Sequence, residues 1–236
     1  MITGGASGLG QNYSKALSLY GADIFVVSNS QRGWEETRQA VEGNGQKIGF
    51  LQRDITEPGC ADEIIAQCVK EMGGLDILVN NAGIQIRNDV LAFKDEDWDK
   101  VLSSNLSSVF YCCRAAIPPM LSHGSGRIIN ISSMWGVNGA SCEAAYSASK
   151  AGVGGLTQAL AKELARSKIP VNALACGVID TEMNKQLDEA ERAELAEDIP
   201  AGRFATPEEV AEMVWELICA PEYLTGQIIT FDGGYL

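Results

Sequence analysis

The sequence predicts an α/β fold in which a doubly wound parallel sheet forms the middle of three layers, in one domain spanning residues 1–236. Short apolar runs typical of buried strands alternate with longer amphipathic runs typical of helices. No linker, repeat or low-complexity tract interrupts this alternation. Strand–helix–strand units cross over with a right hand, so they build a parallel sheet with helices on both faces.

The expected elements follow in order after a glycine-rich stretch that opens a first helix. Strands are expected at 22–27, 47–54, 75–83, 126–132, 170–175 and 226–234. Helices are expected at 34–42, 60–72, 95–120, from about 144 to 166, 188–197 and 207–218. We expect Pro118 and Pro119 to end the helix that begins at Asp95, because proline lacks the amide hydrogen that a helix interior needs.

The composition excludes several classes of function. The 236 residues carry a net charge of −13, which argues against a nucleic acid or an anionic membrane surface as partner. No apolar run reaches the roughly 18 residues of a membrane span. Seven cysteines without a C-x-x-C spacing indicate reduced thiols, and we expect a cytoplasmic protein without a metal centre. The only histidine, His123, falls in the expected polar loop "SHGSG", so proton transfer must use other side chains.

The stretch "TGGASGLG", residues 3–10, is suited to binding a dinucleotide. Glycines let the backbone turn tightly and approach a pyrophosphate, whose charge is favourable at the N-terminus of the following helix. The stretch lacks the Gly-Lys-Ser/Thr of a nucleoside-triphosphate loop. Taken alone, such glycines also fit an ordinary turn.

Tyr146 and Lys150 stand one helical turn apart in "AAYSASKAGV" and share a helix face. A free tyrosine has a pKa of about 10 and is a poor base near neutrality. An ammonium roughly 4 Å away favours the phenolate by about 4 kcal/mol, or about three pKa units, at an effective dielectric constant near 20. We therefore expect Lys150 to lower the pKa of Tyr146, although a lone Tyr–Lys pair also occurs as a surface contact.

Four ordered motifs together resemble the short-chain dehydrogenase/reductase family over essentially the whole chain. They are "TGGASGLG", "NNAG" at 80–83, Ser133, and Tyr146 with Lys150. The resemblance implies a Rossmann-type fold and NAD(P)-dependent interconversion of a ketone and a secondary alcohol. It implies a catalytic set of Asn105, Ser133, Tyr146 and Lys150, in which Asn105 holds a water that links Lys150 to solvent.

The resemblance also implies the nucleotide contacts. These are Gly4, Ser7, Gly8, Leu9, Gly10, Ser28, Asp54, Ile55, Asn81, Ala82, Gly83, Tyr146, Lys150, Gly177, Ile179 and Thr181. Asp54 is expected at the adenine, and Thr181 at the nicotinamide or the pyrophosphate. Ser28 stands at the end of the second strand, where an acidic residue would select NAD, so the cofactor is NAD or NADP without a preference.

The chain departs from the family in two places. Only Met1 and Ile2 precede Thr3, whereas the family has a central strand of about 5–6 residues there. Either the sequence begins late, or the nucleotide site stands on a damaged scaffold with two exposed strand edges. Cys176-Gly177 replaces the usual Pro-Gly, and we expect Cys176 near the nicotinamide in a packing role.

Substrate motifs are mixed. "GVIDTEM" and "IPAGRFATPEEVAE" look like 3-oxoacyl-[acyl-carrier-protein] reductases, whereas "GADIFVVS" and "DEDWDKV" look like sugar-acid dehydrogenases that act on deoxygluconates. We rank the oxoacyl reductase first, with an acyl-thioester or other small ketone as substrate. Arg166 and Lys168 could then offer an acidic carrier protein a basic surface beside the cleft. A dinucleotide-binding sensor or scaffold without turnover is the alternative from another class.

We also expect a lid and an oligomer. The resemblance puts the substrate pocket after Ser133, around 142–143, and in the stretch 178–200. This stretch is predicted to be a mobile lid that brings Met183 or Leu187 against the substrate. Two helices are apolar on more than one side, which predicts a homotetramer. The residues concerned are Val101, Leu102, Leu106, Val109, Phe110, Tyr111, Val153, Leu156, Leu160 and Leu164.

Overall fold

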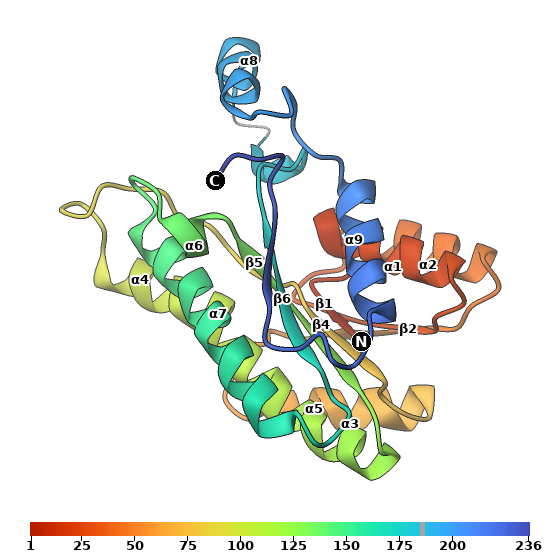
Figure 1. Ribbon diagram of the computed structural model, residues 1–236. Helices are drawn as coiled ribbons and strands as arrows, with labels where there is room; N and C mark the ends of the chain where they lie inside the picture. The colour runs from red at the N-terminus through yellow and green to blue at the C-terminus, as the bar shows by residue number, and fades with distance from the viewer. Residues whose placement is uncertain (185–186) are drawn as a thin grey trace.

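Seven parallel strands form one sheet in the order β3-β2-β1-β4-β5-β6-β7 (Figure 1). The computed structural model describes residues 1–184 and 187–236. The strands are β1 (Ile2–Thr3), β2 (Ile24–Ser28), β3 (Ile48–Gln52), β4 (Ile77–Asn80), β5 (Arg127–Ser133), β6 (Val171–Cys176) and β7 (Ile228–Phe231). The order reverses beside β1, as the predicted doubly wound topology requires, and the predicted fold class is confirmed.

Helices cover both faces of the sheet. One layer holds α3 (Cys60–Met72), α5 (Ser108–His123) and α7 (Ala144–Leu164); the other holds α1 (Gly8–Leu19), α2 (Trp34–Gly43) and α9 (Pro207–Cys219) (Figure 1). Each layer has its own apolar core, with Leu78 and Ile128 facing the first and Val79 and Ile129 the second. This division follows from the alternation of side chains along a strand. Among the described residues, no helix combines the length and apolar character that crossing a bilayer requires.

The two residues of β1 occupy the centre of the sheet and keep it continuous. Ile2 pairs with Val26 of β2 on one side and with Val79 of β4 on the other. The amide of Val79 donates to the carbonyl of Met1 at 2.9 Å. Both residues of β1 are buried. Where β1 lies, the exposed strand edges of the second alternative are therefore not found, because Ile2 pairs with both neighbouring strands and Thr3 pairs with Val27.

The long helix expected from residue 95 to 120 differs from the prediction in two respects. It consists of α4 (Asp95–Leu102), a π-helical turn η1 (Ser103–Ser107) and α5, which continues through Pro118 and Pro119 to His123. The prolines remove two amide donors but do not end the helix, because Met120 behind them is fully buried in the core. Gly124, with a φ of 88°, ends it instead. His123 is therefore the last residue of α5 and not part of a loop.

The loops divide between the two edges of the sheet. The carboxyl edge carries the glycine-rich loop, α6 (Trp135–Asn138), η2 (Glu182–Asn184) and α8 (Glu189–Asp198). Arg166 and Lys168 lie between the end of α7 and the start of β6, at the opposite, amino edge. The expectation that they lie beside the cleft is wrong, because the length of β6 separates them from its carboxyl end.

Candidate active site

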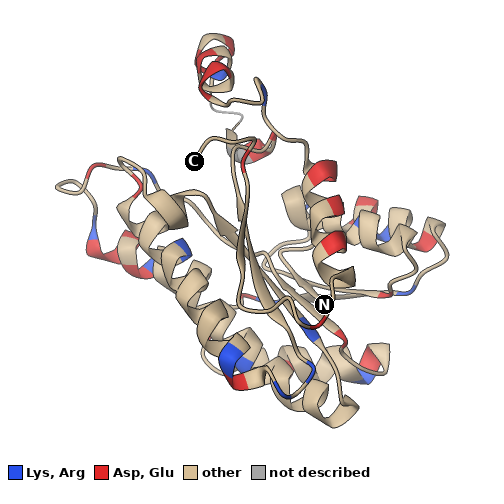
Figure 2. Cartoon of the chain, in the orientation of Figure 1, with Lys and Arg blue, Asp and Glu red and all other residues tan. Residues whose placement is uncertain are grey.

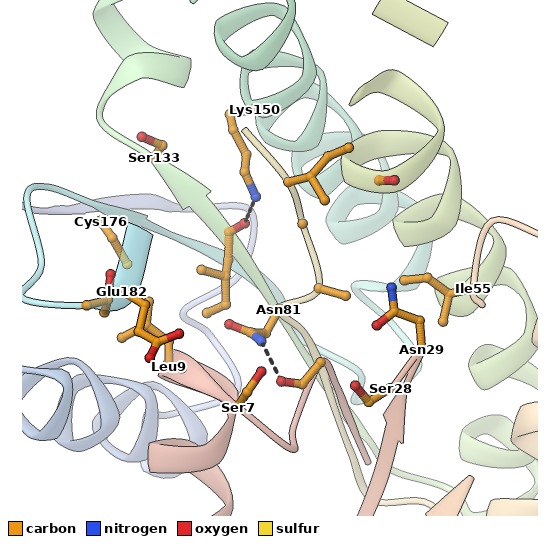
Figure 3. Close-up of a pocket in the computed structure, with 18 of the residues that line it drawn as sticks. Ser7, Leu9, Ser28, Asn29, Ile55, Asn81, Ser133, Lys150, Cys176 and Glu182 are labelled. Carbon is orange, nitrogen blue, oxygen red and sulfur yellow. Dashed lines mark hydrogen bonds between the residues drawn. The ribbon is translucent and has the colours of Figure 1, made fainter. Parts of the chain in front are cut away.

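A cavity of about 390 Å³ opens at the carboxyl ends of β1, β2, β4, β5 and β6 (Figure 3). Ser28 and Asn29 lie towards one end of it, and Ser133 and Lys150 towards the other. A crevice at this edge, where the strand order reverses, is the usual ligand site of an open α/β sheet. The topology thus brings together motifs that are more than a hundred residues apart in sequence.

The glycine-rich loop leaves space at the N-terminus of α1. A Cβ on Gly8, whose φ is 54°, would meet no atom within 4 Å and would project into open space at the cavity wall. Gly10 lies beneath the loop, where a Cβ would stand 2.2 Å from the carbonyl oxygen of Gly4. Ser7 makes no side-chain cap to the helix, and the first amides of a helix lack partners within it. The loop therefore fits a pyrophosphate held by backbone amides.

Thr3 joins the glycine-rich loop to the "NNAG" motif. Its hydroxyl accepts hydrogen bonds from the amides of Asn81 and Ala82 at 3.0 and 3.1 Å. The side-chain amide of Asn81 donates to the carbonyl of Thr3 at 3.0 Å. These bonds fix the ends of β1 and β4 relative to each other, so the two loops form one continuous wall.

Ser133, Tyr146 and Lys150 line the other end of the cavity. Ser133 ends β5 and Lys150 lies on α7; the two residues are 6% and 5% exposed. The Nζ atom of Lys150 donates to the carbonyl of Ile131 at 2.8 Å and lies 5.8 Å from the ring centroid of Tyr146. The expected sharing of one helix face is therefore present, although the ammonium is directed at β5 as well as towards the tyrosine.

Burial controls the proton affinities at this end. It lowers the pKa of Lys150 to about 8, while the nearby Cys176 thiol acts in the opposite direction. Burial also raises the pKa of Tyr146 well above its usual range, although the Ser133 hydroxyl partly opposes this. Among the chain's own residues, the predicted lowering of the Tyr146 pKa is thus wrong, because exclusion of water outweighs an ammonium directed at a carbonyl group.

Asn105 is fully buried in the π-helical turn and does not line the cavity. Its Oδ1 accepts from the amide of Ile84 at 2.8 Å, and its Nδ2 donates to the carbonyl of Ile84 at 2.8 Å. A second, longer bond joins Nδ2 to the Ser149 hydroxyl at 3.2 Å. A π-helical turn often marks a functional site. Asn105 connects the loop after β4 to the helix that carries Tyr146 and Lys150, and its expected water remains a prediction.

The chain resembles characterised proteins over almost its whole length. The sequence profile described as short chain dehydrogenase matches residues 1–192. The chain belongs to the short-chain dehydrogenase family. A 3-oxoacyl-[acyl-carrier-protein] reductase FabG from Thermotoga maritima is 38% identical over 235 residues, which cover 99% of this chain and 96% of the relative.

Further relatives agree. The protein of the same name from Escherichia coli K12 is 34% identical over 236 residues, which cover 99% of this chain and 95% of the relative. A crystal structure of a short-chain type dehydrogenase/reductase from Mycobacterium marinum has a TM-score of 0.93 at 34% identity, covering 99% of this chain and 93% of that chain. The protein is accordingly an NAD(P)-dependent oxidoreductase of this family that interconverts a ketone and a secondary alcohol.

Most residues proposed for the short-chain dehydrogenase's nucleotide site line the cavity. All sixteen do so except Gly10, which supports the loop from below. Asp54 lines the adenine side and also accepts from the amide and hydroxyl of Thr56 at 2.9 and 2.8 Å. Sequence reasoning missed several lining residues, among them Asn29, Ser30, Arg53, Thr56, Ile84, Ser104, Ile131, Ser132, Glu182 and Asn184. Most of these residues lie within a few residues of the end of a predicted strand, and this position is the signal that could have identified them.

Cys176 is buried at the end of β6 and lines the cavity, as expected from its place before Gly177. Burial raises the pKa of its thiol to about 12, while Lys150 acts in the opposite direction. A thiol that stays protonated is a weak nucleophile, which supports the packing role. Gly177 keeps the turn: its amide donates to the carbonyl of Phe231 at 2.9 Å.

The stretch 178–200 leaves the sheet after Gly177 and carries the exposed helix α8, which stands away from the sheet (Figure 1). Its base is anchored, because Ile179 and Ile199 are both buried. Thr181 lines the cavity and Leu187 is half-buried. Residues 185 and 186 and the side chain of Met183 lie outside the described part of the chain. The expected substrate contact of Met183 falls there.

Proposed function

We propose that this short-chain dehydrogenase reduces a 3-oxoacyl-type ketone, with Tyr146 as proton donor, Lys150 and Ser133 as its partners, and Asn105 as a link to α7. The proposal is carried by one observation: Ser133, Tyr146 and Lys150 together line one end of the cavity, whose other end is suited to a dinucleotide. The names of the most similar relatives support the substrate class.

The residues divide the proton chemistry among them. A reduced nicotinamide supplies hydride to the carbonyl carbon when it is bound in the cavity. The Ser133 hydroxyl donates to the carbonyl oxygen and orients it. Tyr146 transfers its phenolic proton to that oxygen, and its high pKa in a water-poor site suits an acid in this direction. Lys150, held by the carbonyl of Ile131, keeps a positive charge near the phenolate that forms.

Either nicotinamide cofactor fits the adenosine end. Ser28, Asn29 and Ser30 line this part of the cavity with hydroxyl and amide groups, which can hydrogen-bond a ribose hydroxyl or a 2′-phosphate. Arg32 stands nearby and pairs with Glu182, which itself lines the cavity. Assays with both NADH and NADPH are therefore part of the test.

We propose a small thioester, and not a carrier-bound one, as the preferred form of the substrate. The helix α8 and its N-cap, which follow the cavity-lining Glu182 and Asn184 in the chain, carry six acidic residues and one arginine between Asp188 and Asp198 (Figure 2). Such a surface repels an acidic carrier protein, and the basic residues once expected to attract it lie at the far edge. A faster reaction with a carrier-bound acetoacetyl group than with a short thioester would contradict this.

The decisive assay follows NADH and NADPH oxidation with acetoacetyl thioesters and with keto-sugar acids. Turnover of the thioesters supports the oxoacyl proposal. Turnover of the sugar acids alone supports the second candidate, a sugar-acid dehydrogenase, which the motifs "GADIFVVS" and "DEDWDKV" favour. Nucleotide binding without turnover of any ketone would favour the sensor or scaffold.

We further propose a cytoplasmic homotetramer. Phe110 is 41% exposed on α5, beside the half-buried Leu106, Tyr111 and Leu156, whereas Val101, Val109, Val153, Leu160 and Leu164 are used in the core. An aromatic face of this kind supports burial against another subunit. All seven cysteines are free thiols, which supports a reducing compartment. A monomeric mass in solution at micromolar concentration would contradict the tetramer.

A further inference from the structure

A buried carboxylate lies immediately before the helix of the catalytic pair. Glu143 is the N-cap of α7 and is 4% exposed, although glutamate is rarely buried unless it is paired. Its carbonyl accepts from the amide of Ser147 at 2.8 Å, so it takes part in the first turn of the helix. Tyr146 lies in the first turn of α7, three residues after Glu143, and Lys150 stands one turn further along the same helix face.

The carboxylate is held by the loop that follows β4. Its Oε2 accepts from the side-chain amide of Gln85 at 2.7 Å, and its Oε1 lies 3.2 Å from Nε of Arg87. The next residue in this loop, Asn88, donates its amide to the carbonyl of Cys142 at 2.9 Å. We call Gln85, Arg87, Asn88, Cys142 and Glu143 the clamp. It joins the loop after β4, which lines the cavity at Gly83 and Ile84, to the turn that leads into α7.

The contacts of the clamp hold part of its backbone in an unfavourable conformation. Cys142 has a φ of 61°, one of two non-glycine residues with positive φ among those described. Such a conformation persists only where surrounding contacts hold it, and it is found preferentially at functional sites. Here the bond from Asn88 and the burial of Glu143 hold it, and the conformation turns the chain into α7.

Charged groups surround Tyr146 on several elements. Lys150 stands one turn later on α7, and Cys176 lies on β6. Glu143, which pairs with Arg87, comes three residues before Tyr146. The charged side chains of the neighbouring α4 are exposed or half-buried; they are Asp95, Glu96, Asp97, Asp99 and Lys100. The negative charge of Glu143 adds to the effect of burial in raising the pKa of Tyr146.

We propose that Glu143 is a positioning residue for the reaction: locked by Arg87 and Gln85, it fixes Tyr146 from the N-terminal side of α7 and holds it in its proton-donating form, opposite Lys150. This inference rests on the proposed role of Tyr146. It assigns a purpose to a buried carboxylate, paired with the half-exposed Arg87, that the nucleotide site does not use. It also explains why a carboxylate is tolerated next to a group that must end the reaction as an anion: the charge favours return of the proton to Tyr146.

The test measures ionisation of Tyr146 without requiring turnover. The protein is labelled with carbon-13 at the ring carbon that bears the tyrosine hydroxyl, bound to oxidised nucleotide, whose positively charged nicotinamide lowers the pKa of the phenol, and titrated by NMR from about pH 6 to about pH 11. Comparison with Tyr146→Phe assigns the signal. Glu143→Gln keeps the size of the side chain and removes its charge, and Glu163→Gln removes the same charge from an exposed position on α7 as a matched control.

The proposal predicts shifts of opposite sign. Glu143→Gln should move the phenol titration about half a pH unit lower, and Arg87→Gln should move it higher, because the carboxylate of Glu143 then lacks the neighbouring guanidinium. Glu163→Gln should match the wild type. Wild-type titrations in both clamp variants would overturn the proposal. Should one variant fail to fold, the other decides by its sign.

Turnover distinguishes this inference from the proposed function. In the folded Glu143→Gln variant, the pH profile of alcohol oxidation should shift lower with the phenol titration, whereas a purely structural role would change only the amount of folded protein. If Tyr146→Phe left turnover unchanged, the proposed function would fall, while the NMR titration would still decide whether Glu143 acts on Tyr146.

Discussion

The two walls of the cavity are built in different ways. The wall from β5 and α7 is buried and bonded to backbone: Nζ of Lys150 donates to Ile131, and the hydroxyl of Ser132 donates to the carbonyl of Lys150 at 3.1 Å. The wall formed by residues 178–200 carries α8, none of whose residues is buried. The helix α8 is held through exposed side chains, such as Arg192, which forms an ion pair with Asp180 at 2.9 Å.

The difference separates two tasks. A hydrogen bond to a buried group costs about 1–3 kcal/mol to leave unmade, whereas an exposed ion pair contributes about 0–1 kcal/mol. The α7 wall therefore stays in one arrangement, as proton transfer needs. We expect α8 to move at small cost, as entry and release of substrate would need.

The largest expected effect comes from removing the phenolic hydroxyl of Tyr146 from the α7 wall. Tyr146→Phe should lower turnover at least about a hundredfold, because the phenol is the proposed acid and phenylalanine keeps only its shape. Nucleotide affinity, measured by fluorescence titration, should change little. Unchanged turnover in a correctly folded variant would remove the proposed mechanism.

Lys150→Met should separate function from stability in the same wall. Turnover should fall on the order of ten- to a hundredfold, and its pH dependence should shift upward, because the phenol loses a positive neighbour. Buried Lys150 has a pKa of about 8 against 10.5 for an ordinary lysine. The ammonium thus destabilises the folded protein below about pH 8.

The pH dependence of unfolding checks this. Between about pH 8 and 10.5 the unfolded wild type binds more protons than the folded one, so its free energy of unfolding rises with pH, by up to about 3 kcal/mol. Lys150→Met lacks this rise. Parallel denaturation curves for the two proteins across this window would contradict the burial of a charged lysine.

Sequence reasoning succeeded where spacing on regular elements fixes geometry. The Tyr146–Lys150 pair, the doubly wound parallel sheet and the glycine loop follow from helical period, alternation and turn chemistry. It missed that α5 continues through Pro118, because that depends on core packing from distant segments. It also placed Lys168 at the wrong edge and overlooked Arg87 as a partner of Glu143, since contacts between loops leave no periodic signal.

Gly136→Ala sharpens the claim that the α7 wall is closely packed. A Cβ there would lie 2.6 Å from the carbonyl carbon of Lys150 and 2.8 Å from its Cβ, so α6 must move away from α7. We expect a loss of about 1–3 kcal/mol in the free energy of unfolding, together with reduced turnover. Gly155→Ala on α7, where a Cβ meets nothing within 4 Å, is the control and should not destabilise.

Hydrogen exchange tests the opposite wall. Amides in residues 178–200 should exchange rapidly in the empty protein and slow when nucleotide and a ketone or alcohol bind together, because closure covers them. The amides of β5 should be protected in both states. High protection of the stretch before binding, unchanged afterwards, would show that it is not a lid.

The smallest effect concerns how α8 is held. The guanidinium of Arg192 pairs with Asp180 and lies 4.8 Å from the ring centroid of Phe204, so this one side chain joins α8 to both ends of the lid's base. Because the ion pair is exposed, Arg192→Gln should change the global free energy of unfolding by less than about 1 kcal/mol.

Exchange of α8 amides in the empty protein should nevertheless quicken a few-fold in Arg192→Gln, while exchange in β5 stays the same. The KM for substrate should rise a few-fold with little change in kcat, because a looser lid closes less often but leaves Tyr146 and Lys150 in place. A fall in kcat without faster exchange in α8 would mean that Arg192 acts on the rigid wall, and the separation of the two walls would then be wrong.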